Sequence, residues 1–278
     1  MILAALASLA LSASPEEVSA AEAALASGDA HYARRAEGAH GGTADPIHVD
    51  RAIADYRRAL ALEPLSYEAR LRLLRAFFFR GGFCDMDPRE QVKLFDEAKK
   101  LAEDTVRLLD ADVHRVRGRL RADAARTIAP AAETYLWAAV SWGQWAVFHK
   151  LYAAWQSAPA RIRDLAQAVI QIEPAIAQAG GYLILGRLHV EAPRIPMLTG
   201  WVSREKGLAH LRTGLAIAPD NTALMYFLAD ALLSLDPSRK EEARVLLQRC
   251  ATTPPRSEYL VEDAHYAQQA RERLAGLR

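Results

Sequence analysis

Tryptophan is unevenly distributed along this chain, and its spacing is the sequence feature closest to a binding site. Four of the five tryptophans lie within residues 137–155. Trp142, Trp145, His149 and Tyr152 follow one another at steps of three, four and three residues, which places them on one face of a helix. Small residues between them leave room beside the rings, so this stripe predicts an apolar cleft. The alternative is a helix whose aromatic face belongs to the core.

Three more aromatic residues are expected near the same cleft. Tyr135 and Trp137 lie on the same predicted helix, and Trp201 directly follows a predicted loop at 191–200. The candidate ligand-binding residues are therefore Tyr135, Trp137, Trp142, Trp145, His149, Tyr152 and Trp201. A ligand in such a cleft is held mainly by apolar area removed from water.

No group of residues has the spacing of a catalytic or metal site. His31, His40 and His48, with Asp45 and Asp50, are of types that ligate transition metals. No pair among them has the i, i+4 spacing of a helical zinc site, which favours a solvated loop. A GxSxG sequence and a Gly-rich phosphate loop after a strand are both missing. The sequence predicts a protein that is not an enzyme and has no metal and no cofactor.

Composition excludes several other classes of protein. The chain has 278 residues, of which 51% are hydrophobic, so a large core forms without a disulfide scaffold. Thirty-five Lys and Arg against thirty-four Asp and Glu leave a net charge of +1, which removes the main attraction to nucleic acid. Only two cysteines are present, Cys84 and Cys250, and the sequence leaves open whether they pair.

The first residues predict export. Residues 1–13 read MILAALASLALSA and are followed by Ser14 and Pro15, which fits the apolar region and small-residue cleavage zone of a signal segment. A basic residue is missing before the apolar run, so a misassigned start or a short N-terminal helix stays an alternative. We predict a signal segment at 1–13, a single tetratricopeptide-like helical domain at 14–278, and a periplasmic location.

Beyond Pro15 the apolar residues recur at steps of three and four, and strand signals are almost absent. One pattern repeats: a small residue, a large one four later, a small one three later, and a proline or aspartate five later. Its copies are Ala52, Tyr56, Ala59, Pro64; Ala98, Ala102, Thr105, Asp110; Ile162, Ala166, Val169, Pro174; Gly207, Leu211, Gly214, Pro219; and Ala243, Leu247, Cys250, Pro255. This pattern is typical of the second helix of a tetratricopeptide pair. We therefore predict an all-α, irregular tetratricopeptide-like (TPR-like) solenoid of antiparallel helix pairs, with loop inserts at 37–48, 81–88 and 191–200.

Two segments, together with these irregular helices, resemble a known family. ETYLWAAVSWGQWAVF (133–148) and GRLHVEAPRIPMLTGWVSREKGLAHL (186–211) are similar to the T-component family associated with bacterial TRAP transporters. The resemblance implies an exported periplasmic homotrimer, commonly a lipoprotein, that docks with the substrate-binding P-component and has an apolar pore or cleft. No cysteine follows the signal-like segment, so a lipid anchor has no support here.

Two functions follow from these observations. One is a non-enzymatic periplasmic accessory protein of a TRAP-type transport system, which binds the solute-receptor partner and an apolar small ligand in the aromatic cleft. The alternative is a general TPR-type scaffold for protein–protein interaction, unrelated to transport. A homo-oligomer, implied by the resemblance to be a trimer, is also favoured by surplus apolar side chains at 77–79 and around Trp201. Because 77–79 are three consecutive phenylalanines, at least one should face a groove, a partner subunit or the next repeat.

Overall fold

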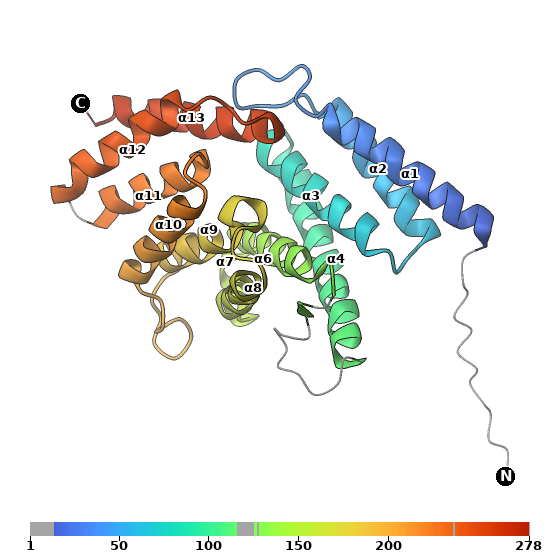
Figure 1. Cartoon of the computed structure of the whole chain (residues 1–278). Helices are drawn as coiled ribbons and strands as arrows, with labels where there is room; N and C mark the ends of the chain where they lie inside the picture. The colour runs from blue at the N-terminus through green and yellow to red at the C-terminus, as the bar shows by residue number, and fades with distance from the viewer. Residues whose placement is uncertain (1–13, 116–124, 127, 236, 278) are drawn as a thin grey trace, which may run out of the picture.

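The computed structural model describes residues 14–115, 125, 126, 128–235 and 237–277, and this part of the chain is all-α (Figure 1). Within these residues the only β-type contacts are two isolated bridges, one of them between Ala44 and Cys84. The α-helices are α1 (Pro15–Ala33), α2 (Pro46–Leu62), α3 (Tyr67–Phe83), α4 (Pro88–Arg115), α6 (Ala131–Phe148), α7 (Lys150–Trp155), α8 (Ala158–Ile172), α9 (Ile176–Glu191), α10 (Arg204–Ile217), α11 (Thr222–Leu235), α12 (Lys240–Thr252) and α13 (Leu260–Ala275). Two short 3₁₀ turns, η1 (Pro237–Arg239) and η2 (Ser257–Tyr259), precede the last two helices.

Several helices begin where a side chain caps them. Ser14 and Glu17 form a capping box at the start of α1, and the Asp45 carboxylate accepts the backbone N–H of Ile47 at the start of α2. Asp87 accepts the N–H of Arg89 in the same way before α4. These caps satisfy N–H groups that have no partner inside the helix, which fixes where each helix starts.

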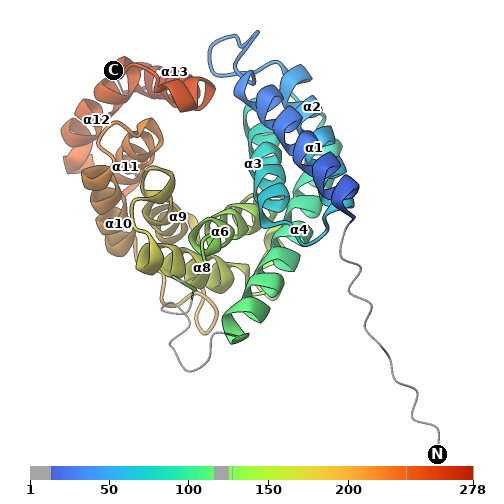
Figure 2. The same cartoon turned by 45° about the vertical axis from the view of Figure 1, so that its right-hand side comes forward.

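Consecutive helices pack side by side in antiparallel pairs and form two layers of a curved array. Figure 2 shows α3, α6, α9 and α11 on the inside of the curve, and α2, α4, α8, α10 and α12 on the outside. The five copies of the sequence pattern fall on the five outer helices. Every pattern position within those helices, apart from the terminal proline or aspartate, is buried. The prediction of an all-α, TPR-like repeat of antiparallel helix pairs is confirmed.

Glycine lets the paired helices approach closely. A Cβ on Gly28 of α1 would come within 2.5 Å of the Tyr56 ring on α2. A Cβ on Gly186 of α9 would likewise meet the Leu211 side chain of α10 at 2.5 Å. Side chains of the outer helices therefore sit directly on glycine backbone of the preceding helix.

The predicted inserts are partly shifted. Residues 81–83 belong to α3, where Gly81 faces the Phe95 ring, so the second connection is only residues 84–87. The first connection runs over 34–45, because Pro46 already starts α2, and the third runs over 192–203. The second shift has a physical cause: Gly81 is needed for close helix packing, although glycine in a sequence usually indicates a loop.

The three consecutive phenylalanines differ in their surroundings, because α3 packs against α2, α4 and α6 and also contacts Tyr32 of α1. Phe77 and Phe79 are fully buried, Phe79 against the Tyr32 ring at 6.0 Å. Phe78 faces the next repeat, with its ring 5.9 Å from that of Trp137. Two of the three rings are therefore core, and the third faces α6.

The C-terminal helix returns to the N-terminal helices and closes the array into a ring (Figure 2). The ring of His265 in α13 lies edge-on to that of Phe83 at the end of α3, with centroids 5.3 Å apart. Nη2 of Arg35, just after α1, lies 3.5 Å from the Glu262 carboxylate and also donates to the Glu258 carbonyl oxygen. First and last repeats are thus in direct contact.

Among the described residues, no helix has the length and apolarity needed to cross a membrane. The predicted signal segment, 1–13, lies outside the described residues.

Candidate functional site

Four of the predicted ligand-binding residues do lie together on one side of α6 and α7. The Trp145 ring lies 5.4 Å from that of Trp142, 4.8 Å from that of His149 and 5.8 Å from that of Tyr152, measured between centroids. Trp142 and Trp145 are only 3% and 4% exposed. They pack in one cluster with Ala153, Ala158 and Ile162.

Protein atoms cover the two buried tryptophans. Nζ of Lys99 lies 4.2 Å and 4.7 Å from the ring centres of Trp142 and Trp145. The Asp96 carboxylate accepts a hydrogen bond from Nε1 of Trp145 at 2.9 Å and lies 3.0 Å from Nε2 of His149. This is the arrangement of an aromatic core with a polar cover.

The remaining three predicted residues lie in other surroundings. Tyr135 is buried in a cluster with Leu109. Trp137 packs against Phe78 and donates through Nε1 to Glu133. The Trp201 ring is 5.4 Å from that of His189, with the Arg163 guanidinium over its face at 4.5 Å.

The seven side chains therefore do not share one cluster of contacts. The reason is that α6 is packed against α3, α4, α8 and α9, so its aromatic side chains are shared among several neighbours. Uptake of an apolar ligand at any of these rings stays a prediction.

Cysteine and histidine show no reactive or metal-binding arrangement in the described part of the chain. Cys84 and Cys250 are both free and buried, and burial raises the pKa of each thiol to about 12. The rings of His31 and His48 lie 6.1 Å apart, each near a carboxylate, but His40 is exposed elsewhere. No set of three metal-ligating side chains gathers among the described residues.

The inner layer carries a row of half-buried side chains that sequence analysis missed. The Arg187 guanidinium of α9 lies 4.1 Å from the ring centre of Phe227 on α11. The rings of Phe227 and Tyr226 lie 5.6 Å and 5.9 Å from that of Tyr266 on α13. These four residues, the inner-face row, join α9 and α11 of the inner layer to α13 through aromatic and cation–π contacts.

Charges of both signs flank this inner-face row. Arg187 forms an ion pair with Glu191 at 2.8 Å, and Asp230 forms one with Arg273 at 2.9 Å. Burial raises the pKa of Glu262, partly offset by the nearby Arg35 guanidinium. Burial also raises the pKa of the Tyr266 phenol, which stays neutral at ordinary pH. The inner face therefore offers aromatic surface together with paired cations and anions.

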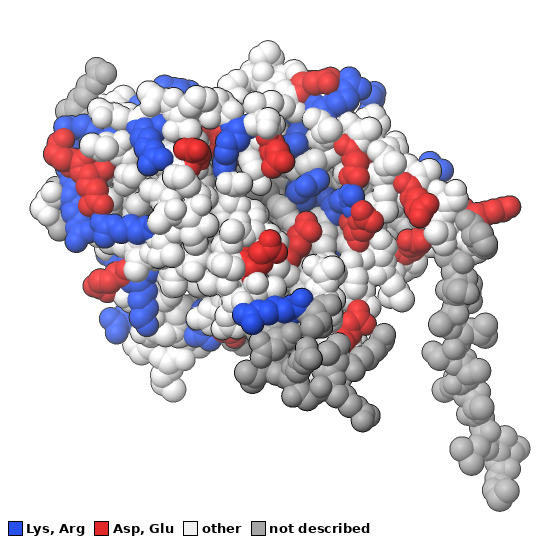
Figure 3. Space-filling model, in the orientation of Figure 1, with Lys and Arg blue, Asp and Glu red and all other residues white. Residues whose placement is uncertain are grey.

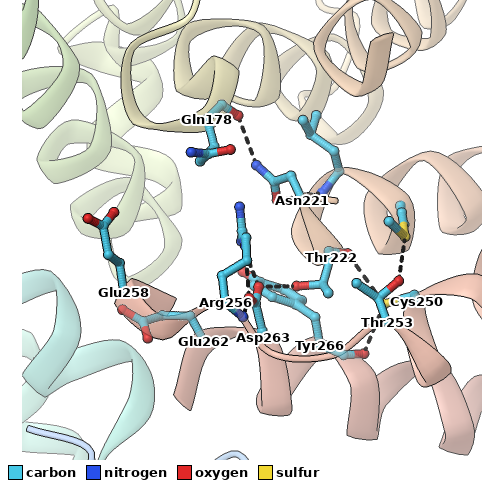
Figure 4. Close-up of polar contacts among 12 residues, drawn as sticks. Gln178, Asn221, Thr222, Cys250, Thr253, Arg256, Glu258, Glu262, Asp263 and Tyr266 are labelled. Atoms are coloured by element: carbon cyan, nitrogen blue, oxygen red, sulfur yellow. Dashed lines mark hydrogen bonds and ion pairs between the residues drawn. The ribbon is translucent and has the colours of Figure 1, made fainter. Parts of the chain in front are cut away.

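A buried polar cluster holds α13 in place beside this row (Figure 4). The Asp263 carboxylate, 1% exposed, accepts from Nε of Arg256 at 2.8 Å, from its Nη2 at 2.6 Å and from Oγ1 of Thr222 at 2.6 Å. Nearby, Nδ2 of Asn221 donates to the Gln178 carbonyl oxygen at 2.9 Å. Because α13 carries Tyr266, this cluster also positions the last member of the inner-face row.

One sequence signal points to the inner face. Glu262, Tyr266, Gln269 and Arg273 are spaced four, three and four apart, a helical stripe of large polar and aromatic residues. The contacts to Arg187 and Phe227, by contrast, depend on which helices become neighbours. No short-range sequence pattern predicts which helices become neighbours.

The face shown in Figure 3 has no broad patch of one charge among its described residues. On the face shown in Figure 3, Lys and Arg are interspersed with Asp and Glu over most elements. This agrees with the net charge of +1 and offers no extended basic surface for nucleic acid on that face.

Comparisons with known proteins add little. No family model matches the chain, and no curated protein matches it. Among solved structures, the chain is similar to one described as the TPR2AB-domain:pHSP90-complex of yeast Sti1, with 13% identity and a TM-score of 0.32, over 93% of this chain and 98% of that one. At that TM-score, the assignment of a helical repeat rests on the packing of this chain's own helices.

Proposed function

We propose that this protein is a non-enzymatic, TPR-type scaffold that holds a segment of a partner protein on the inner face of its helical ring. The inner-face row of Arg187, Tyr226, Phe227 and Tyr266 carries this proposal. The repeat pattern buries small and aliphatic residues between helices and leaves these large side chains only partly buried.

The chemistry of the row fits a peptide partner. Tyrosine and arginine are the residues that most often dominate binding energy at protein interfaces, and the row combines both with Phe227. Neighbouring pairs such as Asp230 and Arg273 supply donors and acceptors for a peptide backbone. A partner segment with apolar or aromatic side chains and both charge signs matches this surface.

Site-specific photo-crosslinking in the native host tests the proposal. A photoreactive residue at Phe227 should trap a partner protein. The same residue at Val245, which is exposed on the outer helix α12, should not. Equal crosslinking at the two positions, or crosslinking at Val245 alone, would contradict an inner-face site.

The identity of the trapped protein separates two finer proposals. The resemblance of residues 133–148 and 186–211 to the TRAP T-component family supports a periplasmic accessory protein whose partner is a P-component-like solute-binding protein. Mass spectrometry of the Phe227 crosslink should then identify such a protein, and intact mass of the exported chain should show an N-terminus near Ser14. A partner of another class favours the general interaction scaffold.

A further inference from the structure

An exposed apolar stripe runs from the end of α6 along α7. Its members are Val147 and Phe148 at the end of α6 and Leu151, Tyr152 and Trp155 on α7, with the non-helical residue His149 between the two helices. Leu151 is 91% exposed and Trp155 is 80% exposed. All five side chains are exposed to solvent.

Three of the five side chains contact other aromatic rings. The Phe148 ring stacks on that of Phe95 at 5.7 Å. Tyr152 contacts Trp145 on one side and Trp155 on the other, with ring centroids 5.8 Å and 5.7 Å apart. A pre-organised apolar surface loses little side-chain freedom when it is covered.

We infer that this stripe packs against the same stripe of a second copy of the chain. The five side chains expose on the order of 500–600 Å² of apolar surface, at the top of the range for patches on monomers and most of the roughly 800 Å² per partner in a standard interface. The stripe is also the largest run of exposed large apolar residues in the described part of the chain, so it is its own best apolar partner.

Charge at the edge of the stripe favours a second copy over an anionic membrane. Lys150 lies within the stripe's helix, and Asp96, 49% exposed at its side chain, lies beside His149 at the edge. The edge therefore carries both signs of charge, which a second copy of the same surface can match, whereas an anionic lipid surface would repel Asp96. The contact involves none of the inner-face residues, so it stands or falls separately from the proposed function.

Sedimentation velocity over a concentration series tests the inference. The wild-type chain should change from about 30.6 kDa to twice that mass in the micromolar range. In the double variant Leu151→Ser/Trp155→Ser, association should be at least tenfold weaker, so the protein should remain a single chain over the same concentration range. The control Val245→Ser, which removes another exposed apolar side chain on α12, should dimerise like the wild type.

A single introduced thiol locates the contact. Oxidised Trp155→Cys should form a disulfide-linked dimer, and Val245→Cys should not; the native thiols are buried and do not compete. A wild-type monomer at about 100 μM, an oligomer that survives the double variant, or a trimer without the Trp155→Cys crosslink would overturn the inference. So would wild-type binding to phosphatidylglycerol vesicles as a monomer, lost in the double variant, because a lipid surface would then be the occupant.

Discussion

Gly42 and His265 are 223 residues apart in the sequence, yet the Gly42 carbonyl oxygen lies 3.3 Å from Nδ1 of His265. A Cβ on Gly42 would come within 2.3 Å of the His265 Cα, which is backbone and cannot turn aside. The first connection and the last helix therefore meet backbone to backbone. This contact, with the Arg35–Glu262 pair beside it, makes the array a closed ring rather than an open spiral.

Gly42→Val should separate α13 from the first connection. Because the added side chain overlaps the backbone of α13, we expect a loss of about 1–3 kcal/mol in the free energy of unfolding. Hydrogen exchange of α13 amides should also become faster. Gly82→Ala is the matched control, since no atom lies within 4 Å of a Cβ there and alanine is the better helix former. If Gly42→Val left α13 as protected as the control does, the close approach would not be what holds the ring closed.

Mutation of the buried Asp263 cluster should lower the stability of the fold more than mutation of an exposed ion pair. Asp263→Ala leaves the Arg256 guanidinium without its carboxylate in a largely buried position, so we expect a loss of about 3–5 kcal/mol in unfolding free energy. Asp230→Asn breaks the ion pair between Asp230 and Arg273, in which both side chains are nearly half-exposed. We expect this variant to lose about 1 kcal/mol or less in unfolding free energy. Urea denaturation compares the two variants. Similar losses in both would contradict a special role for the buried pair.

Trp145→Ala distinguishes a core aromatic cluster from a ligand cleft. Since the ring is buried beneath Lys99 and Asp96, we expect a loss of about 3–5 kcal/mol in stability and no change in binding of an apolar fluorescent probe. Trp155→Ala, at an exposed ring, should leave the stability of the single chain within about 0.5 kcal/mol. Reduced probe binding with little stability loss in Trp145→Ala would restore the cleft interpretation.

Local packing explains why the outer helices could be predicted from the sequence. Ala52, Tyr56 and Ala59 contact helices that follow or precede them directly in the chain, so their spacing alone carries the information. The aromatic residues of α6 were harder to interpret, because helical spacing shows which side chains share a face but not what covers that face. Lys99 and Asp96, which cover Trp142 and Trp145, come from α4, far away in the sequence.

Ring closure and the inner-face row could not be predicted in this way. The Arg187–Phe227 contact joins residues on different helix pairs, and the Gly42–His265 contact joins the two ends of the chain. The first depends on how neighbouring repeats pack, and the second on the cumulative curvature of the array, which no repeat by itself encodes. Gly42 looks like an ordinary loop glycine in the sequence, although its lack of a side chain is what allows α13 to dock.

The stability of the fold should depend on pH through His189. Its ring is 5% exposed, and Nδ1 accepts the backbone N–H of Ser203 at 3.1 Å. Burial, with help from His210, Lys206 and Arg163, lowers the pKa of His189 from 6.5 to about 4. Between these two values the unfolded chain binds more protons at this histidine than the folded chain does. The contribution of His189 to the free energy of unfolding is therefore fully present above about pH 6.5. It is lost as the pH falls toward 4, by at most about 3 kcal/mol.

The comparison with His189→Asn isolates this effect from other titrating groups. Burial lowers the pKa of His265 and adds a loss in the same direction, whereas the raised pKa of Glu262 favours the fold as the pH falls. The asparagine amide oxygen can still accept the Ser203 N–H but does not titrate. Unfolding free energies measured at about pH 7 and about pH 4.5 should therefore differ less in His189→Asn than in the wild type. An equal difference in both proteins would mean that the pKa of His189 is not lowered in the folded chain. Its ring would then take up a proton without leaving its place beside Trp201 and His210.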